Sequence, residues 1–254
     1  MSDGPEPIDW QGKALDCGQC QFKARGEAGK CGLGWACADE RYSKRVERFL
    51  LLNPDLADQC LTHPNFEVRA LAARRATVFR LPPLLDDPDP EVRAIAIMRL
   101  PAVQARRRLK DPDRGVRTAV AYRLEPSDQH LLFEDPDPFV RVVAARRAEP
   151  GMLPVLSGDA DAEVRKVVAR RVPLAWLEAL ATDADPLVRR TVAERLPLSR
   201  LALMVSDEDM RVRHVVAERA KDDLLLRLMG DPEPLIAETA RKRLIELEAA
   251  HVDG

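Results

Sequence analysis

Residues 159–173 read DADAEVRKVVARRVP, and this pattern recurs along the chain every 24 residues. The valine at its centre, Val164, has a counterpart in each of eight registers, with no insertion between them. These pivot residues are Val68, Val92, Val116, Val140, Val164, Val188, Val212 and Ile236. A fixed period of this length is typical of repeat proteins, in which each repeat packs against its neighbours.

Each repeat carries the signals of a helix start. The residue three before the pivot is Asp in six repeats, Asn65 in the first and Glu233 in the last, and Pro follows it directly in four. Asp and Asn are preferred helix N-caps, and Pro is favoured at the first helical position. Positions 0, 3, 4 and 8, counted from the pivot, are apolar or small, so they share one face of an α-helix. We therefore predict one α-helix per repeat, packed through that face.

Only about eight residues separate this helix from the next Asp, and a proline often opens them. Pro173, followed by Leu174, Leu177 and Leu180, is an example. This length allows one or two turns, so we predict a short α- or 3₁₀-helical segment rather than a second full helix. Strand signals are missing, since no stretch sustains a period-two alternation. The predicted fold class is all-α.

Two columns of arginine run through the repeats. Position 7 is Arg in all eight registers, position 1 is Arg in seven, and position −5 is Asp in seven. Seven residues turn a helix to within about 20° of its starting face, so the position-7 arginine points to the packed side and needs acceptors. We predict that it forms forks with the position −5 carboxylates and with loop carbonyls.

Two functional interpretations of these charged residues stay open. The arginine columns could form a phosphate-binding stripe, and the Asp-x-Asp steps could hold a divalent cation. Against a stripe, the outward position 6 has mixed charge, and 40 Lys and Arg nearly balance 42 Asp and Glu in the whole chain. Against a cation, the glycine and terminal glutamate of a calcium loop are absent. We therefore favour a structural role for both sets.

The first 38 residues lack the period but hold four of the five cysteines. Cys17, Cys20, Cys31 and Cys37 have the spacing C-x2-C-x10-C-x5-C, and four thiols this close favour a Cys₄ metal centre. A [4Fe-4S] cluster and a zinc ion both fit four cysteines. Only the first pair has the form of a zinc knuckle, so the spacing favours the cluster, with zinc as the alternative. The glycines among these cysteines leave backbone N–H groups that could approach the cluster sulfides.

The repeat pattern divides the chain into three predicted regions. Residues 1–38 form the four-cysteine segment, residues 39–62 an atypical capping repeat with Lys44 at the pivot position, and residues 63–254 eight repeats with a C-terminal tail. Cys60 falls at a position that is leucine in later repeats, so we predict a buried core thiol. There is no secretory signal and no stretch of about 18 apolar residues, so we expect a cytoplasmic protein.

Together, the Asp-Pro-Asp-Pro-x-Val-Arg repeat start, the downstream Arg-Leu-Pro and the preceding cysteines resemble the leucine-rich repeat variant family. The resemblance covers nearly the whole chain, with departures at its ends, such as His63 in place of the usual aspartate. It implies a right-handed superhelical solenoid of alternating α- and 3₁₀-helices, preceded by a small [4Fe-4S] domain. It also implies that Cys17, Cys20, Cys31 and Cys37 are the cluster ligands and that Cys60 is not.

The residues present do not indicate an enzyme. The four histidines are scattered, and the chain has neither a nucleophile elbow nor a phosphate-binding loop. We predict an iron–sulfur repeat protein that acts as a binding scaffold for a protein partner, with the cluster as a candidate for redox control. Nucleic-acid binding by the solenoid and electron transfer through the cluster are the alternatives.

Overall fold

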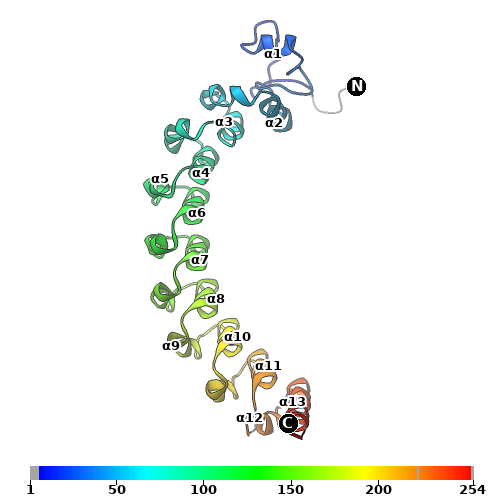
Figure 1. The fold of residues 1–254 in the computed structure, drawn as a ribbon, viewed down its shortest axis with the longest axis vertical. Helices are drawn as coiled ribbons and strands as arrows, with labels where there is room; N and C mark the ends of the chain where they lie inside the picture. The colour runs from blue at the N-terminus through cyan, green and yellow to red at the C-terminus, as the bar shows by residue number, and fades with distance from the viewer. Residues whose placement is uncertain (1–5, 222, 253–254) are drawn as a thin grey trace. The chain divides into compact units, whose positions relative to one another are not determined.

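The computed structural model describes residues 6–221 and 223–252 (Figure 1). The chain divides into two compact units, Met1–Glu125 and Pro126–Gly254, which we call the N-terminal and C-terminal units and describe separately. Within each unit the longer α-helices lie in one row, and the shorter segments that connect them lie in a second row (Figure 1). The part of the chain that the structure describes forms no strand and only three isolated bridges.

The N-terminal unit contains the cysteine segment and the first repeats. Its α-helices are α1 (Lys23–Glu27), α2 (Ser43–Leu52), α3 (Phe66–Ala73), α4 (Pro90–Arg99), α5 (Ala102–Ala105) and α6 (Arg114–Arg123). Its 3₁₀ segments are η1 (Pro54–Leu56), η2 (Gln59–Thr62), η3 (Val78–Arg80), η4 (Pro82–Asp86) and η5 (Arg106–Arg108). The helix α2 with η1 and η2 follows the same order as a repeat, although Lys44 replaces the pivot valine.

The C-terminal unit contains the remaining repeats. Its α-helices are α7 (Pro138–Arg147), α8 (Ala162–Arg171), α9 (Leu174–Leu177), α10 (Pro186–Arg195), α11 (Met210–Arg219), α12 (Asp223–Leu228) and α13 (Pro234–Val252). Its 3₁₀ segments are η6 (Pro126–Leu132), η7 (Pro150–Leu156), η8 (Glu178–Leu180) and η9 (Leu198–Met204). The predicted alternation of one full helix with a short α or 3₁₀ segment is confirmed.

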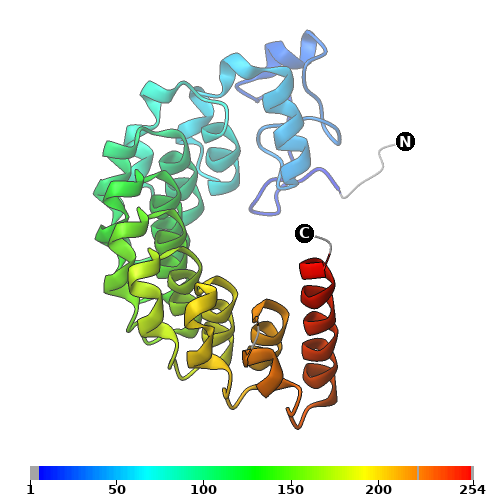
Figure 2. The ribbon, with the colours of Figure 1, turned by 60° about the horizontal axis from the view of Figure 1, so that its bottom comes forward.

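The last helix is longer than the sequence pattern suggested. α13 has 19 residues, whereas α3 has 8 and the full helices from α4 to α11 have 10, and α13 stands out in Figure 2. Interior repeats place a proline soon after the helix, and no proline follows Pro234. The residues expected to form a C-terminal tail therefore extend the last helix.

The predicted helix starts are confirmed. From α3 to α11, each full helix has an Asn or Asp N-cap whose side chain accepts a hydrogen bond from a backbone N–H group. In α8, for example, Asp161 Oδ1 accepts from Glu163 N at 2.8 Å. A cap of this kind contributes about 0.5–2 kcal/mol, so the caps fix where each helix begins.

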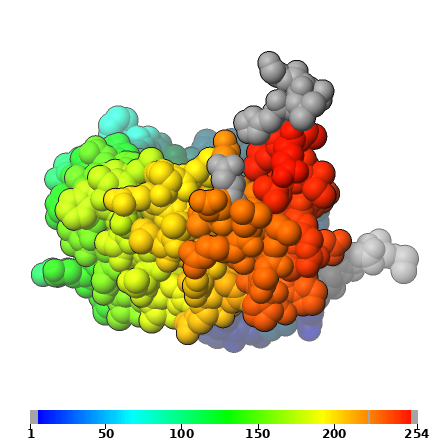
Figure 3. Space-filling view, turned by 90° about the horizontal axis from the view of Figure 1, so that it is seen from below, coloured from blue at the N-terminus to red at the C-terminus, as the bar shows by residue number. Residues whose placement is uncertain are grey.

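The pivot residues form the core. All eight are fully buried, and small residues such as Ala145 and Ala169 are buried beside them, which lets neighbouring helices approach closely. Burying a valine side chain contributes about 1.5–3 kcal/mol. The side chains of successive repeats from α10 to α13 pack in continuous contact (Figure 3).

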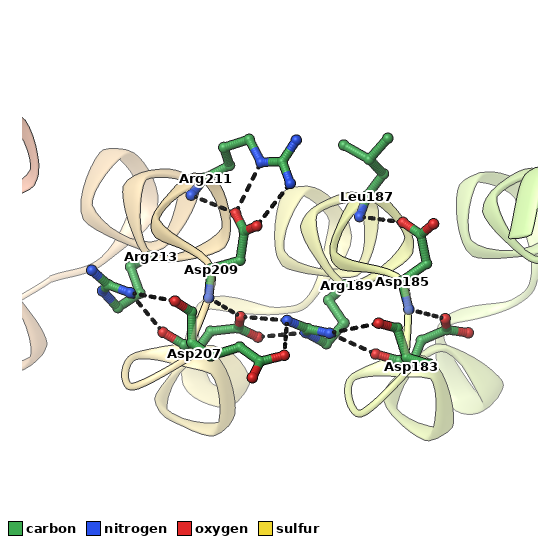
Figure 4. Close-up of polar contacts among 10 residues, drawn as sticks. Asp183, Asp185, Leu187, Arg189, Asp207, Asp209, Arg211 and Arg213 are labelled. Atoms are coloured by element: carbon green, nitrogen blue, oxygen red, sulfur yellow. Dashed lines mark hydrogen bonds and ion pairs between the residues drawn. The ribbon is translucent and has the colours of Figure 1, made fainter.

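A second set of contacts, made of side-chain ion pairs, joins neighbouring repeats. The position-1 arginine of one repeat forms two hydrogen bonds to the position −5 aspartate of the next, and we call this series the arginine–aspartate ladder. It comprises Arg69–Asp87, Arg93–Asp111, Arg141–Asp159, Arg165–Asp183, Arg189–Asp207 and Arg213–Asp231. Arg189, for example, bonds to the two oxygens of Asp207 at 2.8 and 2.9 Å and also donates to Asp183 O at 2.8 Å (Figure 4). Each guanidinium therefore links its own repeat to the following one.

The ladder corrects one sequence prediction, because the position −5 carboxylates pair with position 1 rather than with position 7. Position 1 lies at the start of the helix, beside the loop that carries the aspartate, whereas position 7 lies about two turns further on. The predicted contacts to carbonyls are confirmed for five position-7 arginines, which donate to the end of the preceding helix: Arg99, Arg123, Arg171, Arg195 and Arg219. Arg195, for example, reaches Ala169 O at 2.6 Å and Val172 O at 2.9 Å. The last carbonyls of a helix have no partner within it, so these contacts satisfy them. Arg75, at the first repeat, pairs with Glu47 instead.

Candidate iron–sulfur site

The structure brings the four predicted ligands to one end of the N-terminal unit. Cys17, Cys20 and Cys37 line one pocket of about 300 Å³, together with Leu33 and Asp39. Cys31 does not line this pocket, but it lies close enough to Cys20 for a charge on Cys31 to raise the pKa of the Cys20 thiol. Cys17 is exposed and the other three are partly buried, so the pocket opens at the surface.

Local backbone contacts hold these cysteines in place. Gly32 and Ala36 exchange two backbone hydrogen bonds, of 2.8 and 3.0 Å, in the loop between Cys31 and Cys37. The Trp35 side chain lies over Gly32, where an added Cβ atom would stand 2.3 Å from the indole Nε1, so a larger residue would displace the Trp35 ring. Cys37 N donates to a backbone carbonyl of α2 at 3.3 Å, which ties the loop to the capping repeat.

The glycine N–H groups are less available than the sequence suggested. Gly26 N donates to Phe22 O, Gly29 N to Gly26 O and Gly32 N to Ala36 O. Gly18 N donates to Asp16 Oδ1 at 2.8 Å. These four glycines therefore allow tight turns and do not present N–H groups to a cluster. At Gly29 the positive φ of 69° itself favours glycine.

Burial controls the protonation of the thiols. Loss of solvent raises the thiol pKa of Cys20 and Cys31, and it raises the pKa of Cys37 to about 12. The charge of Asp39 acts in the same direction on Cys20 and Cys37. Iron binds the thiolate, so cluster assembly must displace protons from these sulfurs.

The donor set fits an iron–sulfur cluster. Four thiols are the usual ligands of such clusters. Among the described residues, no three Cys, His, Asp or Glu side chains converge closely enough to hold a metal ion, so the thiols would move closer together around a bound group.

Two residues that the sequence did not assign to the site join it to the first repeat. Asp39 Oδ2 lies 3.7 Å from Cys20 Sγ, and Asp39 Oδ1 lies 2.9 Å from His63 Nε2. His63 Nδ1 accepts a hydrogen bond from Asn65 N, so the ring proton is on Nε2 and is donated to Asp39. The Trp10 ring packs edge-on against His63 at 4.9 Å. The substitution of His63 for the usual aspartate was the signal for this contact.

The ladder is replaced by other pairs at this end. Arg45 has position 1 of the capping repeat, and its ladder partner would be residue 63, where the chain has histidine. Arg45 bonds instead to Glu40, and both side chains are buried. Cys60 lies in η2, away from the lining of the pocket, and is buried as predicted.

Comparisons with known proteins agree with this geometry. A family model described as "LRV protein FeS4 cluster" matches residues 7–59. A solved structure described as a leucine-rich repeat variant with a novel repetitive protein structural motif is 36% identical, with a TM-score of 0.85 over 91% of this chain and 99% of that one. An "uncharacterized 27.7 kDa protein in nifB 3′region" of Rhodobacter capsulatus is 62% identical over 87 residues, which span 34% of this chain and 36% of that protein.

The chain is thus a helical-repeat solenoid with an iron–sulfur domain at its N-terminal end. It belongs to the leucine-rich repeat variant family. The predicted family, fold class and iron–sulfur cofactor are confirmed. The repeat fold is of a non-catalytic, scaffold type. Within the described residues, no helix is both long enough and apolar enough to cross a membrane.

Proposed function

We propose that the chain is a scaffold that binds a protein partner through its repeats, and that Cys17, Cys20, Cys31 and Cys37 hold its cluster. The carrying observation is that the ladder engages the position-1 arginines and the position −5 aspartates inside the array. The exposed side chains of the two rows are then left to meet a partner. Stacked repeats offer extended binding surfaces of this kind.

The same observation gives little support to a phosphate-binding stripe. The ladder guanidinium groups are nearly buried and form paired bonds to carboxylates, as at Arg165 and Asp183. Phosphate contacts would require these arginines to leave their partners. Electron transfer is better supported as a second candidate, because Cys17 is exposed and the pocket opens at the surface.

A bound cluster supplies a one-electron redox centre. The residues of the chain position it, and the bond between Asp39 and His63 is the contact best placed to transmit its state to the repeats. Asp39 borders the cysteine pocket and His63 opens the first repeat. Because each repeat contacts only its neighbours, a change at Asp39 would enter the array through His63. We therefore propose that loss of the cluster alters the first repeat and with it partner binding.

Iron and sulfide analysis of anaerobically purified protein tests the ligand set. Cys17→Ser should lose cluster iron, acid-labile sulfide and visible absorption, whereas Cys60→Ala should keep all three. Zinc without sulfide, or full cluster content in Cys17→Ser, would contradict the assignment. Reversible bleaching by dithionite would support electron transfer, and a cluster that breaks down on reduction would oppose it.

Amide hydrogen exchange tests the link to the repeats. Exchange in α3 should differ between the cluster-loaded and cluster-free proteins, whereas exchange in α11 should not. His63→Leu should remove the difference in α3 by breaking the bond to Asp39. Equal protection of α3 in both forms would argue against redox control.

Capture from an extract of the native host, with loaded and cluster-free protein as separate baits, tests the scaffold. A partner retained in proportion to cluster content would support the proposal. No specifically retained protein would count against a scaffold. Equal retention by both baits would mean that the cluster does not control partner binding.

A further inference from the structure

A row of exposed apolar side chains follows the short segments of the C-terminal unit. Four residues, each 44–79% exposed, come from four successive repeats. These residues, which we call the outer apolar row, are Leu131 of η6, Val155 of η7, Trp176 of α9 and Leu203 of η9. Other residues of the same segments, such as Leu153 and Leu201, fill the core. The row is therefore not needed for packing within the chain.

The row borders a surface hollow. A hollow of about 930 Å³ lies between η6 and η7, and Leu131, Met152 and Val155 contribute apolar walls. Glu134 and Asp159 are also in the lining, which includes no lysine or arginine. Asp159 is held by Arg141 in the ladder, whereas Glu134 is exposed. The hollow thus combines an apolar wall with one exposed carboxylate, that of Glu134, and with the His130 ring.

The sequence around Leu131, Val155 and Trp176 is depleted of positive charge, because residues 126–140, 148–164 and 172–188 contain eleven Asp and Glu and no Lys or Arg. The depletion ends at Leu203, since the exposed Arg200 lies close by in the sequence and pairs with Glu178 at 3.1 Å. The ladder arginines neutralise Asp159 and Asp183, and the N-cap aspartates accept hydrogen bonds from backbone N–H groups. The surface beside Leu131 and Val155, where carboxylates outnumber cationic side chains, therefore attracts cations.

The spacing of the row suits one kind of occupant. Neighbouring packed helices are about 8–10 Å apart, so residues at the same position of successive repeats recur at about this interval. Leu131, Val155 and Leu203 hold position 15, and Trp176 holds position 12, about one turn earlier. Seven residues of an α-helix span about 10.5 Å, so an apolar side chain at every seventh position would meet one row residue per repeat. We propose that the outer apolar row binds an amphipathic α-helix with basic flanks, supplied by a partner protein. This inference rests on the proposed scaffold function and names the class of partner.

The test uses the full, cluster-loaded chain and two synthetic 21-residue peptides. One has leucine at every seventh position and lysines on its flanks, and the other has glutamate in place of each lysine. Fluorescence anisotropy should detect binding of the basic peptide alone, with an affinity that falls as salt is added. The double variant Val155→Glu/Trp176→Glu should weaken it at least about tenfold, which corresponds to about 1.4 kcal/mol.

Phe139→Glu is the matched control. Phe139 is 50% exposed in the same unit but lies on α7, in the other row, so this variant should bind within about twofold of the wild-type chain. Circular dichroism should be the same for all three proteins, because the substituted side chains are exposed.

Several outcomes would overturn the assignment. Preference for the acidic peptide, or equal binding by the double variant, would place the peptide elsewhere on the chain while leaving a scaffold possible. Reversible self-association that the double variant loses would place a second copy on the row. If neither peptide binds, the assignment fails, while the capture experiment tests the scaffold separately.

Discussion

Replacing Arg189 with alanine should destabilise the C-terminal unit by about 3–5 kcal/mol. The Arg189 and Asp207 side chains are each only 7% exposed, and four further acceptor contacts depend on the same guanidinium or carboxylate. Alanine would leave Asp207 charged and nearly buried without its partner, and it would leave the Asp183 carbonyl without its donor. The cost is therefore that of an uncompensated charge rather than of a surface ion pair.

Urea unfolding followed by circular dichroism, with amide exchange in α10 and α11, measures this effect. Both readouts are needed because repeat arrays can lose stability locally before they unfold completely. Arg211→Ala is the matched control. Arg211 lies in the next repeat and pairs with Asp209 of that repeat, but its side chain is 50% exposed. Exposed ion pairs contribute little to stability, so this variant should remain close to wild type.

A loss below about 1 kcal/mol in Arg189→Ala, equal to that of the control, would refute the ladder as a buried ionic network. The double variant Arg189→Met/Asp207→Leu provides a second check. It removes both charges together, so it should be more stable than Arg189→Ala. Equal instability of the two variants would mean that the unpaired carboxylate is not the cause.

Two further predictions concern a glycine and an N-cap. Gly32→Ala should lower cluster content and loosen the cysteine loop, because the added Cβ atom would stand 2.3 Å from the indole nitrogen of Trp35. Gly151→Ala is the control: no atom lies within 4 Å of its added Cβ atom, so the iron content should not change. Hydrogen bonds from Arg211 lower the pKa of Asp209 from 3.8 to about 2, so this charge stabilises α11 above about pH 4 and less as the pH falls towards 2. Asp209→Asn keeps an N-cap oxygen and should abolish this acid dependence of amide exchange in α11; an unchanged pH profile would assign it to other groups.

The repeat could be predicted because its signals are local. An N-cap aspartate, a helical apolar period and a terminating proline each act within one repeat, and eight copies make them unmistakable. The partners of the arginines could not be predicted in the same way. Both arginine columns have acceptors within reach, and only the stacking of the repeats decides which column meets the position −5 aspartate. The length of α13 was accessible, since the sequence after Pro234 has no proline to stop a helix.

The candidate site was predicted unevenly for a similar reason. Four clustered cysteines indicate a metal centre by residue type and spacing alone. Asp39 and His63 do not, because an aspartate at position −5 is common to the repeats and the contact joins residues 24 apart. The one visible signal was His63 itself, a departure from the repeat at the position where the ladder would have begun.

The ladder also bears on how such a chain can change its length. Six junctions have the same chemistry, since an arginine of one repeat bonds to an aspartate of the next. Deleting or duplicating one 24-residue repeat within either unit would leave each of these guanidinium groups with a carboxylate, whereas any other change of length would break a junction. The number of repeats can therefore change stepwise in evolution, which would alter the length of the proposed binding surface without requiring a new interface.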